Sequence, residues 1–289
     1  MPWLRAANRV RADALSWLSA RRRSWADWRR NTLGESLRSS ATPYGFSLVT
    51  RDDPVSGAML DGTFEPDEVR IVEEGLAGAD VFVDVGANVG FFSCIALKRG
   101  KHVIAVEPQP RNLRCFYANL VANGWQDAAE VFPLGLAERP GVRVLYGASG
   151  LSASLIPGWA SLGRRFRQTI PVTTLDILLG DRFAGQRLVV KVDVEGCECQ
   201  VLRGGLATLA RRPRPLWLVE IFLAENHPAG ANPDFRATFE LFWRHGYEAR
   251  TADRRDILIR PEDVDAWRSS GRSGSGTFNY VFRAAGRDA

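Results

Sequence analysis

The chain has 289 residues, of which 45% are hydrophobic and 25% charged, a composition that excludes a disordered or collagen-like protein. Its net charge of +5 is uneven: residues 1–38 hold nine arginines against three acids, a balance of +6, and the rest sums to −1. A nucleic-acid enzyme usually spreads positive charge over its working face, so a nucleic-acid partner is not expected. The apolar runs are too short for a membrane-spanning helix, and the N-terminus lacks a secretory signal pattern, so we expect a cytoplasmic protein.

Residues 1–60 are predicted to form a basic helical extension and a connector that holds one short strand at 46–50. Apolar residues from Trp3 to Trp17 recur at spacings of four and three, which predicts an amphipathic helix with arginines mostly on its other side. We favour packing of this helix on its own domain or on a second subunit. The alternative is peripheral contact of residues 1–30 with the anionic inner membrane surface.

Residues 61–289 are predicted to form one domain in which helices and strands alternate. Helices are expected at 66–76, 91–97, 110–122, 175–179, 235–245 and in a segment ending near 209, and strands at 81–85, 103–107, 129–133, 142–146, 170–172, 187–192, 216–222, 257–259 and 278–282. Several strands are continuously apolar, as in a parallel sheet covered by helices on both faces. The pattern predicts a doubly wound α/β fold.

The segment 81–90, VFVDVGANVG, joins a buried strand to a helix through a glycine-rich turn. Glu107 closes the next strand, at the spacing where a carboxylate accepts the hydroxyls of an adenosine ribose. The dinucleotide pattern G-x-G-x-x-G is incomplete, and Asp84 would repel a pyrophosphate but attract the cationic groups of S-adenosylmethionine. The turn therefore favours S-adenosylmethionine, with a nicotinamide-dependent oxidoreductase acting on a sugar nucleotide as the alternative.

Several motifs in order resemble the FkbM family of S-adenosylmethionine-dependent methyltransferases over about residues 60–250. They are DVGANVG at 84–90, AVEPQP at 105–110, Asn119, VTTLD at 172–176, KVDVEGCE at 191–198 and VLRGG at 201–205. The resemblance implies a Rossmann-like class I methyltransferase with a mostly parallel seven-stranded sheet, whose last strand, at 278–282, is inserted antiparallel. It also implies cofactor contacts from Asp84, Gly86, Ala87, Asn88, Gly90, Glu107 and Asn119.

The predicted catalytic residues lie at or just beyond the carboxyl ends of the strand at 187–192 and of the strand after it. Asp193 is the first candidate for general base or acceptor-orienting group, with Lys191 stabilising a developing alkoxide and Glu195 holding Lys191 or the acceptor. A purely structural ion pair of Lys191 is the alternative. Glu220, at the end of the next strand, is a further candidate for the same cleft. His227 in the following loop is either a base in this cleft or a solvated loop histidine. The polar loop at 147–159 either closes over the acceptor or is an ordinary surface loop.

The sequence thus predicts methylation of a hydroxyl on a sugar, glycan or glycolipid, with a polyketide-like natural product as the alternative acceptor. No N-P-P-Y type tetrapeptide follows the strand at 187–192, which argues against methylation of nucleic acid. The four cysteines, Cys94, Cys115, Cys197 and Cys199, are expected to be reduced thiols, because their spacing fits neither a disulfide framework nor a zinc site. No metal is predicted, and the oligomeric state is left open.

Overall fold

A computed structural model describes residues 36–147, 152–161 and 167–286. By its contacts the chain divides into two compact units, Met1–Ser36 and Leu37–Ala289. The amphipathic helix predicted for residues 1–30 lies outside the described residues. Within the described ranges, no helix combines the length and the apolar character needed to cross a membrane.

The larger unit is built on a mixed sheet whose strand order is β12-β11-β13-β10-β9-β3-β4-β5. In chain order its strands are β3 (Val81–Val85), β4 (His102–Val106), β5 (Ala129–Phe132), β9 (Leu188–Val192), β10 (Leu216–Glu220), β11 (Tyr247–Thr251), β12 (Leu258–Ile259) and β13 (Asn279–Ala284). The five strands from β5 to β10 are parallel, and β13 is antiparallel to both β10 and β11. The doubly wound fold and the antiparallel insertion are therefore confirmed.

The sheet differs from the expected seven strands at its edge, where the two-residue strand β12 adds an eighth. Two predicted strands also leave the main sheet: β7 (Gly141–Tyr146) and β8 (Arg167–Thr173) form a separate three-stranded sheet with β6 (Gly135–Leu136). The mostly exposed β7 fits this peripheral place, because a central strand of the main sheet is buried on both faces.

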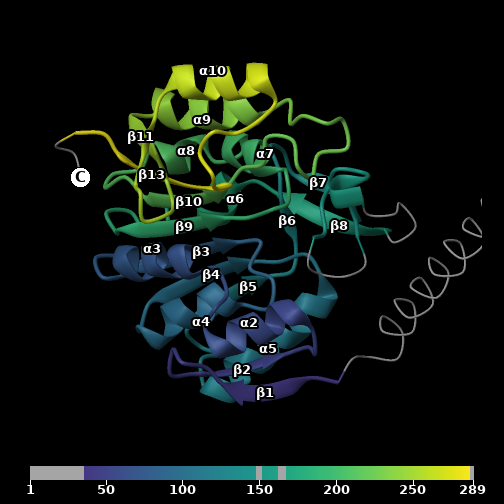
Figure 1. The fold of residues 1–289 in the computed structure, drawn as a ribbon. Coiled ribbons are helices and arrows are strands. Elements are labelled where there is room, and N and C mark those ends of the chain that lie inside the picture. The colour runs from purple at the N-terminus through teal and green to yellow at the C-terminus, as the bar shows by residue number, and fades with distance from the viewer. Residues whose placement is uncertain (1–35, 148–151, 162–166, 287–289) are drawn as a thin grey trace, which may run out of the picture. The chain divides into compact units, whose positions relative to one another are not determined.

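Helices cover both faces of the main sheet (Figure 1). One face carries α2 (Pro54–Asp61), α3 (Pro66–Leu76), α4 (Phe91–Lys98) and α5 (Pro110–Asn123), and the other carries α6 (Leu175–Leu179), α7 (Glu198–Arg203), α8 (Leu206–Leu209), α9 (Phe235–Arg244) and α10 (Pro261–Ser270). The helix predicted to end near residue 209 is two short helices, with Gly204 and Gly205 between them. Each face encloses an apolar core.

The predicted connector belongs to the larger unit. Strands β1 (Arg38–Ala41) and β2 (Ser47–Thr50) form a hairpin, and Phe46, Leu48 and Met59 are buried in the core beside α3 and α4. The division of the chain therefore comes after Ser36, whereas the sequence suggested residue 60. The proline and glycine content of this connector predicts a linker, but its apolar side chains are buried in the core of the larger unit.

The strand order positions the functional end of the sheet. From β3 the chain runs outward through β4 and β5, and it later returns to place β9 and β10 on the other side of β3. This reversal lies between β3 and β9, where an open α/β sheet forms a ligand crevice at the carboxyl ends of its strands.

Candidate active site

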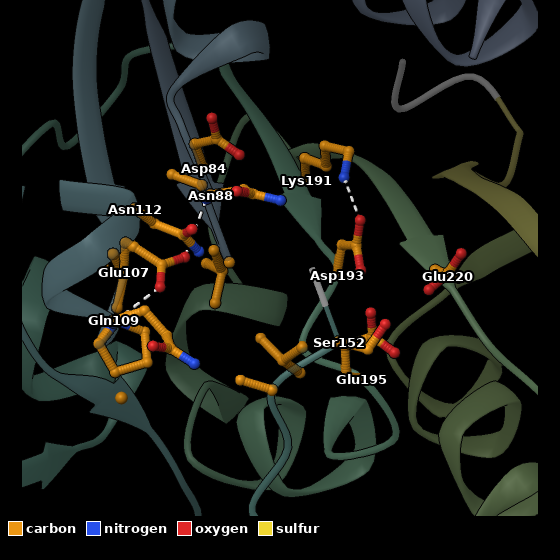
Figure 2. A pocket seen from close by; sticks show the side chains of 18 of the residues that line it. Asp84, Asn88, Glu107, Gln109, Asn112, Ser152, Lys191, Asp193, Glu195 and Glu220 are labelled. Atoms are coloured by element: carbon orange, nitrogen blue, oxygen red, sulfur yellow. Dashed lines mark hydrogen bonds and ion pairs between the residues drawn. The ribbon is translucent and has the colours of Figure 1, made fainter. Parts of the chain in front are cut away.

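A cavity of about 400 Å³ lies at the carboxyl ends of β3, β4, β9 and β10. Its wall includes the turn after β3, the start of α3 and part of the loop that follows β7. Figure 2 shows its polar side chains as two groups, one around Asn88 and Glu107 and the other around Asp193 and Glu220. The first group forms the turn end of the cavity, and the second forms its carboxylate end.

The turn after β3 needs glycine for two reasons. Gly86 has a φ of +85°, and a Cβ there would lie 1.8 Å from the backbone oxygen of Asp193. Gly90 has a φ of +81°, and its Cβ would lie 2.3 Å from the ring of Phe116. The left-handed backbone is strained for other residues, and these contacts leave no room for a side chain. Glycine thus lets the turn pack directly against the end of β9.

Asn88 sits in the same turn with a φ of +52°, a conformation that asparagine tolerates. Its side-chain Oδ1 is buried and has no hydrogen-bond partner among the described residues, although Asn88 lines the cavity. Native structures rarely leave such an atom unpaired, so a ligand donor is its natural partner. Ala87 lines the cavity beside it, whereas Gly90 begins α4 and is not part of the cavity wall.

Glu107 holds the turn from the neighbouring strand. Its Oε2 accepts the backbone N–H of Asn88 at 2.9 Å, and its Oε1 accepts that of Gln109 at 2.8 Å. Burial raises the pKa of Glu107 to about 7, against the effect of these hydrogen bonds. Asp84 is fully buried, its pKa is raised by that burial, and it accepts the Ser93 hydroxyl at 2.6 Å. Both predicted acids therefore face the cavity together.

Asn119 takes a different place from the one predicted. Its side chain donates to the backbone oxygen of Val89 at 2.8 Å and accepts the backbone N–H of Val49, and it is not part of the cavity wall. Asn119 therefore links the turn after β3 to β2. It lies close to the predicted cofactor-binding turn but contacts the backbone of that turn without reaching the cavity.

Lys191 and Asp193 form an ion pair of 2.7 Å at the carboxylate end. Burial opposes the charge of Lys191, but the carboxylates of Asp193, Glu65 and Asp84 outweigh it and raise the pKa of Lys191 above its ordinary value. This ammonium keeps its proton at neutral pH. It can stabilise negative charge but cannot act as a base.

Glu195 is held by the loop that precedes η1 (Trp159–Ser161). Its Oε2 accepts the indole N–H of Trp159 at 2.6 Å, and its backbone oxygen accepts the Ser154 hydroxyl at 2.6 Å. Burial and the nearby Asp193 raise the pKa of Glu195 to about 8. The predicted covering loop thus places Ser152, Ala153 and Leu155 in the cavity wall, and residues 148–151 of this loop lie outside the described residues.

Glu220 lines the cavity at the end of β10, and burial together with Asp193 and Glu195 raises its pKa well above the ordinary value. His227 is not part of the wall. Its ring lies edge-on to Trp159, with 6.1 Å between the ring centres, and burial lowers its pKa. The structure therefore brings four of the five predicted catalytic residues together in the cavity wall and leaves His227 out of it.

Sequence reasoning missed Glu65, which also lines the cavity. It comes directly before Pro66 at the start of α3, where Ser, Thr, Asp or Asn is the usual cap. Burial raises the pKa of Glu65 to about 7. The unusual residue at this cap was the available signal, but nothing in the local sequence shows that the start of α3 faces β9.

The fold and this cavity define a class I methyltransferase arrangement, and the comparisons agree. Residues 84–249 match the methyltransferase FkbM domain, and the chain belongs to this family. It is 27% identical over 187 residues to the hexuronic acid methyltransferase AglP of Haloferax volcanii, covering 64% of this chain and 74% of that protein. The expectation of a methyltransferase is confirmed.

Two solved structures were also compared. The methyltransferase FkbM of Methylobacillus flagellatus is 16% identical, with 71% of this chain and 44% of that chain covered and a TM-score of 0.44. This chain thus spans less than half the length of that protein. A SAM-dependent methyltransferase of Agrobacterium tumefaciens is 10% identical, with 87% and 72% covered and a TM-score of 0.44.

Proposed function

We propose that this protein is an S-adenosylmethionine-dependent O-methyltransferase that acts on a hydroxyl of a sugar or glycan. The observation that carries this proposal is the turn end of the cavity, where the unpaired Asn88 Oδ1 lies beside Glu107 and Asp84. The relative from Haloferax volcanii, named a hexuronic acid methyltransferase, supports a sugar as the acceptor.

The residues of the turn end fit S-adenosylmethionine. Glu107 is the residue that would hold the ribose hydroxyls, and Asn88 offers an acceptor for a donor group of the ligand. The carboxylate of Asp84 favours the ligand's positive charge. When bound, the cofactor supplies an activated methyl group. A pyrophosphate would meet two buried carboxylates here, which disfavours a nicotinamide cofactor.

The carboxylate end supports oxygen over nitrogen as the acceptor atom. A hydroxyl that gives up its proton as it attacks gains negative charge from that deprotonation, which the ammonium of Lys191, whose pKa is raised, would stabilise. The same cation would repel a protonated amine. Glu195 and Glu220, whose pKa values are raised, supply hydrogen-bonding groups that would orient sugar hydroxyls.

Calorimetry and methyl transfer together test this function. We expect the purified protein to bind S-adenosylhomocysteine and to show no measurable affinity for NAD. Radiolabelled methyl should pass from S-adenosylmethionine to members of a saccharide panel that holds neutral hexosides, hexuronides and amino sugars, and NMR should place it on oxygen. Binding of NAD without S-adenosylhomocysteine would contradict the cofactor assignment, and label found only on nitrogen would contradict the O-specificity.

A further inference from the structure

Glu65 has a strained backbone conformation, and its side chain does not cap the helix that it precedes. Its backbone is left-handed, with φ 43° and ψ 57°, and its side chain makes no capping hydrogen bond to α3. A non-glycine residue in this region persists where the surrounding structure fixes it, often at a functional site. Asn88 and Glu195, which also line the cavity, share this conformation.

Six carboxylate side chains line the cavity within the described residues, and four of them are already engaged. Asp84 accepts from Ser93, Glu107 from two backbone amides, Asp193 from Lys191, and Glu195 from Trp159. The side-chain carboxyl groups of Glu65 and Glu220 make no hydrogen bond to a described residue. These two groups are therefore the ones whose oxygens are all available to an acceptor.

Backbone strain separates Glu65 from Glu220. Glu65 has a left-handed backbone, whereas Glu220 lies in the regular strand β10. Burial raises the pKa of Glu65 to about 7; Asp193 after β9, Glu68 on α3 and Asp84 on β3 add to the rise, and Lys191 on β9 opposes it. Burial, Asp193 and Glu195 raise the pKa of Glu220 well above its ordinary value, and Lys191 opposes this rise as well. Of these two carboxyl groups, Glu65 is therefore the one that the structure holds in place against backbone strain.

We propose that Glu65 is the general base of the methyl transfer, a role that rests on the proposed function. The acceptor oxygen forms a bond to the methyl carbon, and the carbon–sulfur bond breaks with its electron pair going to sulfur. The hydroxyl proton passes to the Glu65 carboxylate and then to water. Asp193, the first candidate from sequence, instead forms a 2.7 Å ion pair with Lys191, so its carboxylate already has a partner.

Two substitutions separate this role from a structural one. Glu65→Gln keeps the shape of the side chain and removes the base, so kcat should fall about 100-fold or more while the affinity for S-adenosylhomocysteine stays within threefold. Glu65→Gly relieves the left-handed backbone, so it should lose activity equally yet match or exceed the melting temperature of the wild type. The control is Glu74→Gln, at an exposed position near the other end of α3. It should change neither kcat nor the affinity for S-adenosylhomocysteine.

The pH dependence gives two further readouts, one of kcat and one of melting temperature, and the second needs no acceptor. The wild-type kcat should fall below about pH 7, and Glu65→Gln should lose this limb. An acid whose pKa is raised on folding destabilises the folded state above its unfolded pKa, so Glu65→Gln should gain melting temperature over the wild type between pH 5 and pH 8.

The outcomes are distinct. A loss of kcat under tenfold in Glu65→Gln, an unchanged acidic limb, or a melting difference that is constant with pH overturns the assignment of Glu65. A wild-type protein that neither binds S-adenosylhomocysteine nor transfers methyl overturns the proposed function, and the base role falls with it. Transfer by the wild type combined with an active Glu65→Gln variant leaves the proposed function standing and removes Glu65 alone.

Discussion

Asp84 and Lys191 lie directly opposite each other on the parallel neighbours β3 and β9. Partners in register project toward the same face of a sheet, so the carboxylate of the cofactor motif and the ammonium of the catalytic motif share one environment. Both residues are buried, and Asp84 raises the pKa of Lys191. The two motifs are far apart in the chain, but their charged side chains therefore interact electrostatically (Figure 2).

Replacing Lys191 by methionine should destabilise the protein strongly. The change leaves Asp84, Asp193 and Glu65 without their cation, and breaking a buried ion pair costs about 3–5 kcal/mol. The carboxylates take up protons as the pH falls, so the deficit should shrink between pH 8 and pH 5. Urea unfolding at several pH values measures it, with the exposed Lys98→Met as control. A deficit that does not vary with pH would count against this coupling.

Glu107→Gln should weaken the binding of S-adenosylhomocysteine. The substitution retains one side-chain oxygen for the backbone amides of Asn88 and Gln109 but removes the charge that would hold the ribose hydroxyls. Hydrogen bonds to a charged group contribute about 1.5–3 kcal/mol, so the Kd should rise roughly 10- to 100-fold in calorimetry. Glu130→Gln on β5 is the matched control. Equal affinity of the two variants would place the ribose elsewhere.

Gly86→Ala should abolish cofactor binding and destabilise the fold more than Gly100→Ala. Both glycines have positive φ values, but a Cβ on Gly100 meets nothing within 4 Å, whereas that on Gly86 meets the Asp193 backbone. The control should lose only the roughly 1–2 kcal/mol of left-handed strain. Thermal unfolding and calorimetry of both variants measure the difference. Similar losses of stability in the two variants would show that the close approach of Gly86 to the Asp193 backbone does not determine the effect of the substitution.

Trp159→Phe should reduce kcat by about tenfold and lower the melting temperature. A smaller ring replaces the buried indole, and Glu195 loses the indole N–H that fixes its carboxyl group, a hydrogen bond that contributes about 0.5–1.5 kcal/mol. Trp243→Phe on α9, away from the cavity, serves as the control. Methyl transfer at saturating cofactor is the measurement, and an unchanged kcat would show that Glu195 needs no such support.

The four cysteines should be unreactive in the folded protein. All four are buried, and burial raises the pKa of Cys197 to about 12 and that of Cys199 to about 11, so little thiolate forms at pH 8. Ellman's reagent should label none of them in buffer and all four in 6 M guanidinium chloride, where guanidinium unfolds the chain. Rapid labelling of any thiol before unfolding would contradict this expectation.

Much of the fold could be predicted from local signals. The helix at 66–76 and the strand at 81–85 have the predicted bounds, because a proline at the helix start and a continuous apolar run are both local features. Strand β11 and helix α10 were missed. The alternation of polar and apolar residues in β11 is short, and α10 is largely exposed with Val264 as its buried residue, so neither gives a strong hydrophobic period.

The sequence by itself determined the glycine turn, the acid of the neighbouring strand and the family, since each depends on residue types at fixed spacing along the chain. Only the tertiary structure decided which polar side chains share the cavity. Glu65, at the start of α3, lines the cavity. Asn119 instead accepts a hydrogen bond from β2, and His227 lies outside the cavity wall. The reason is physical: burial and the charges of neighbouring strands set the state of each group, and these neighbours are remote in sequence.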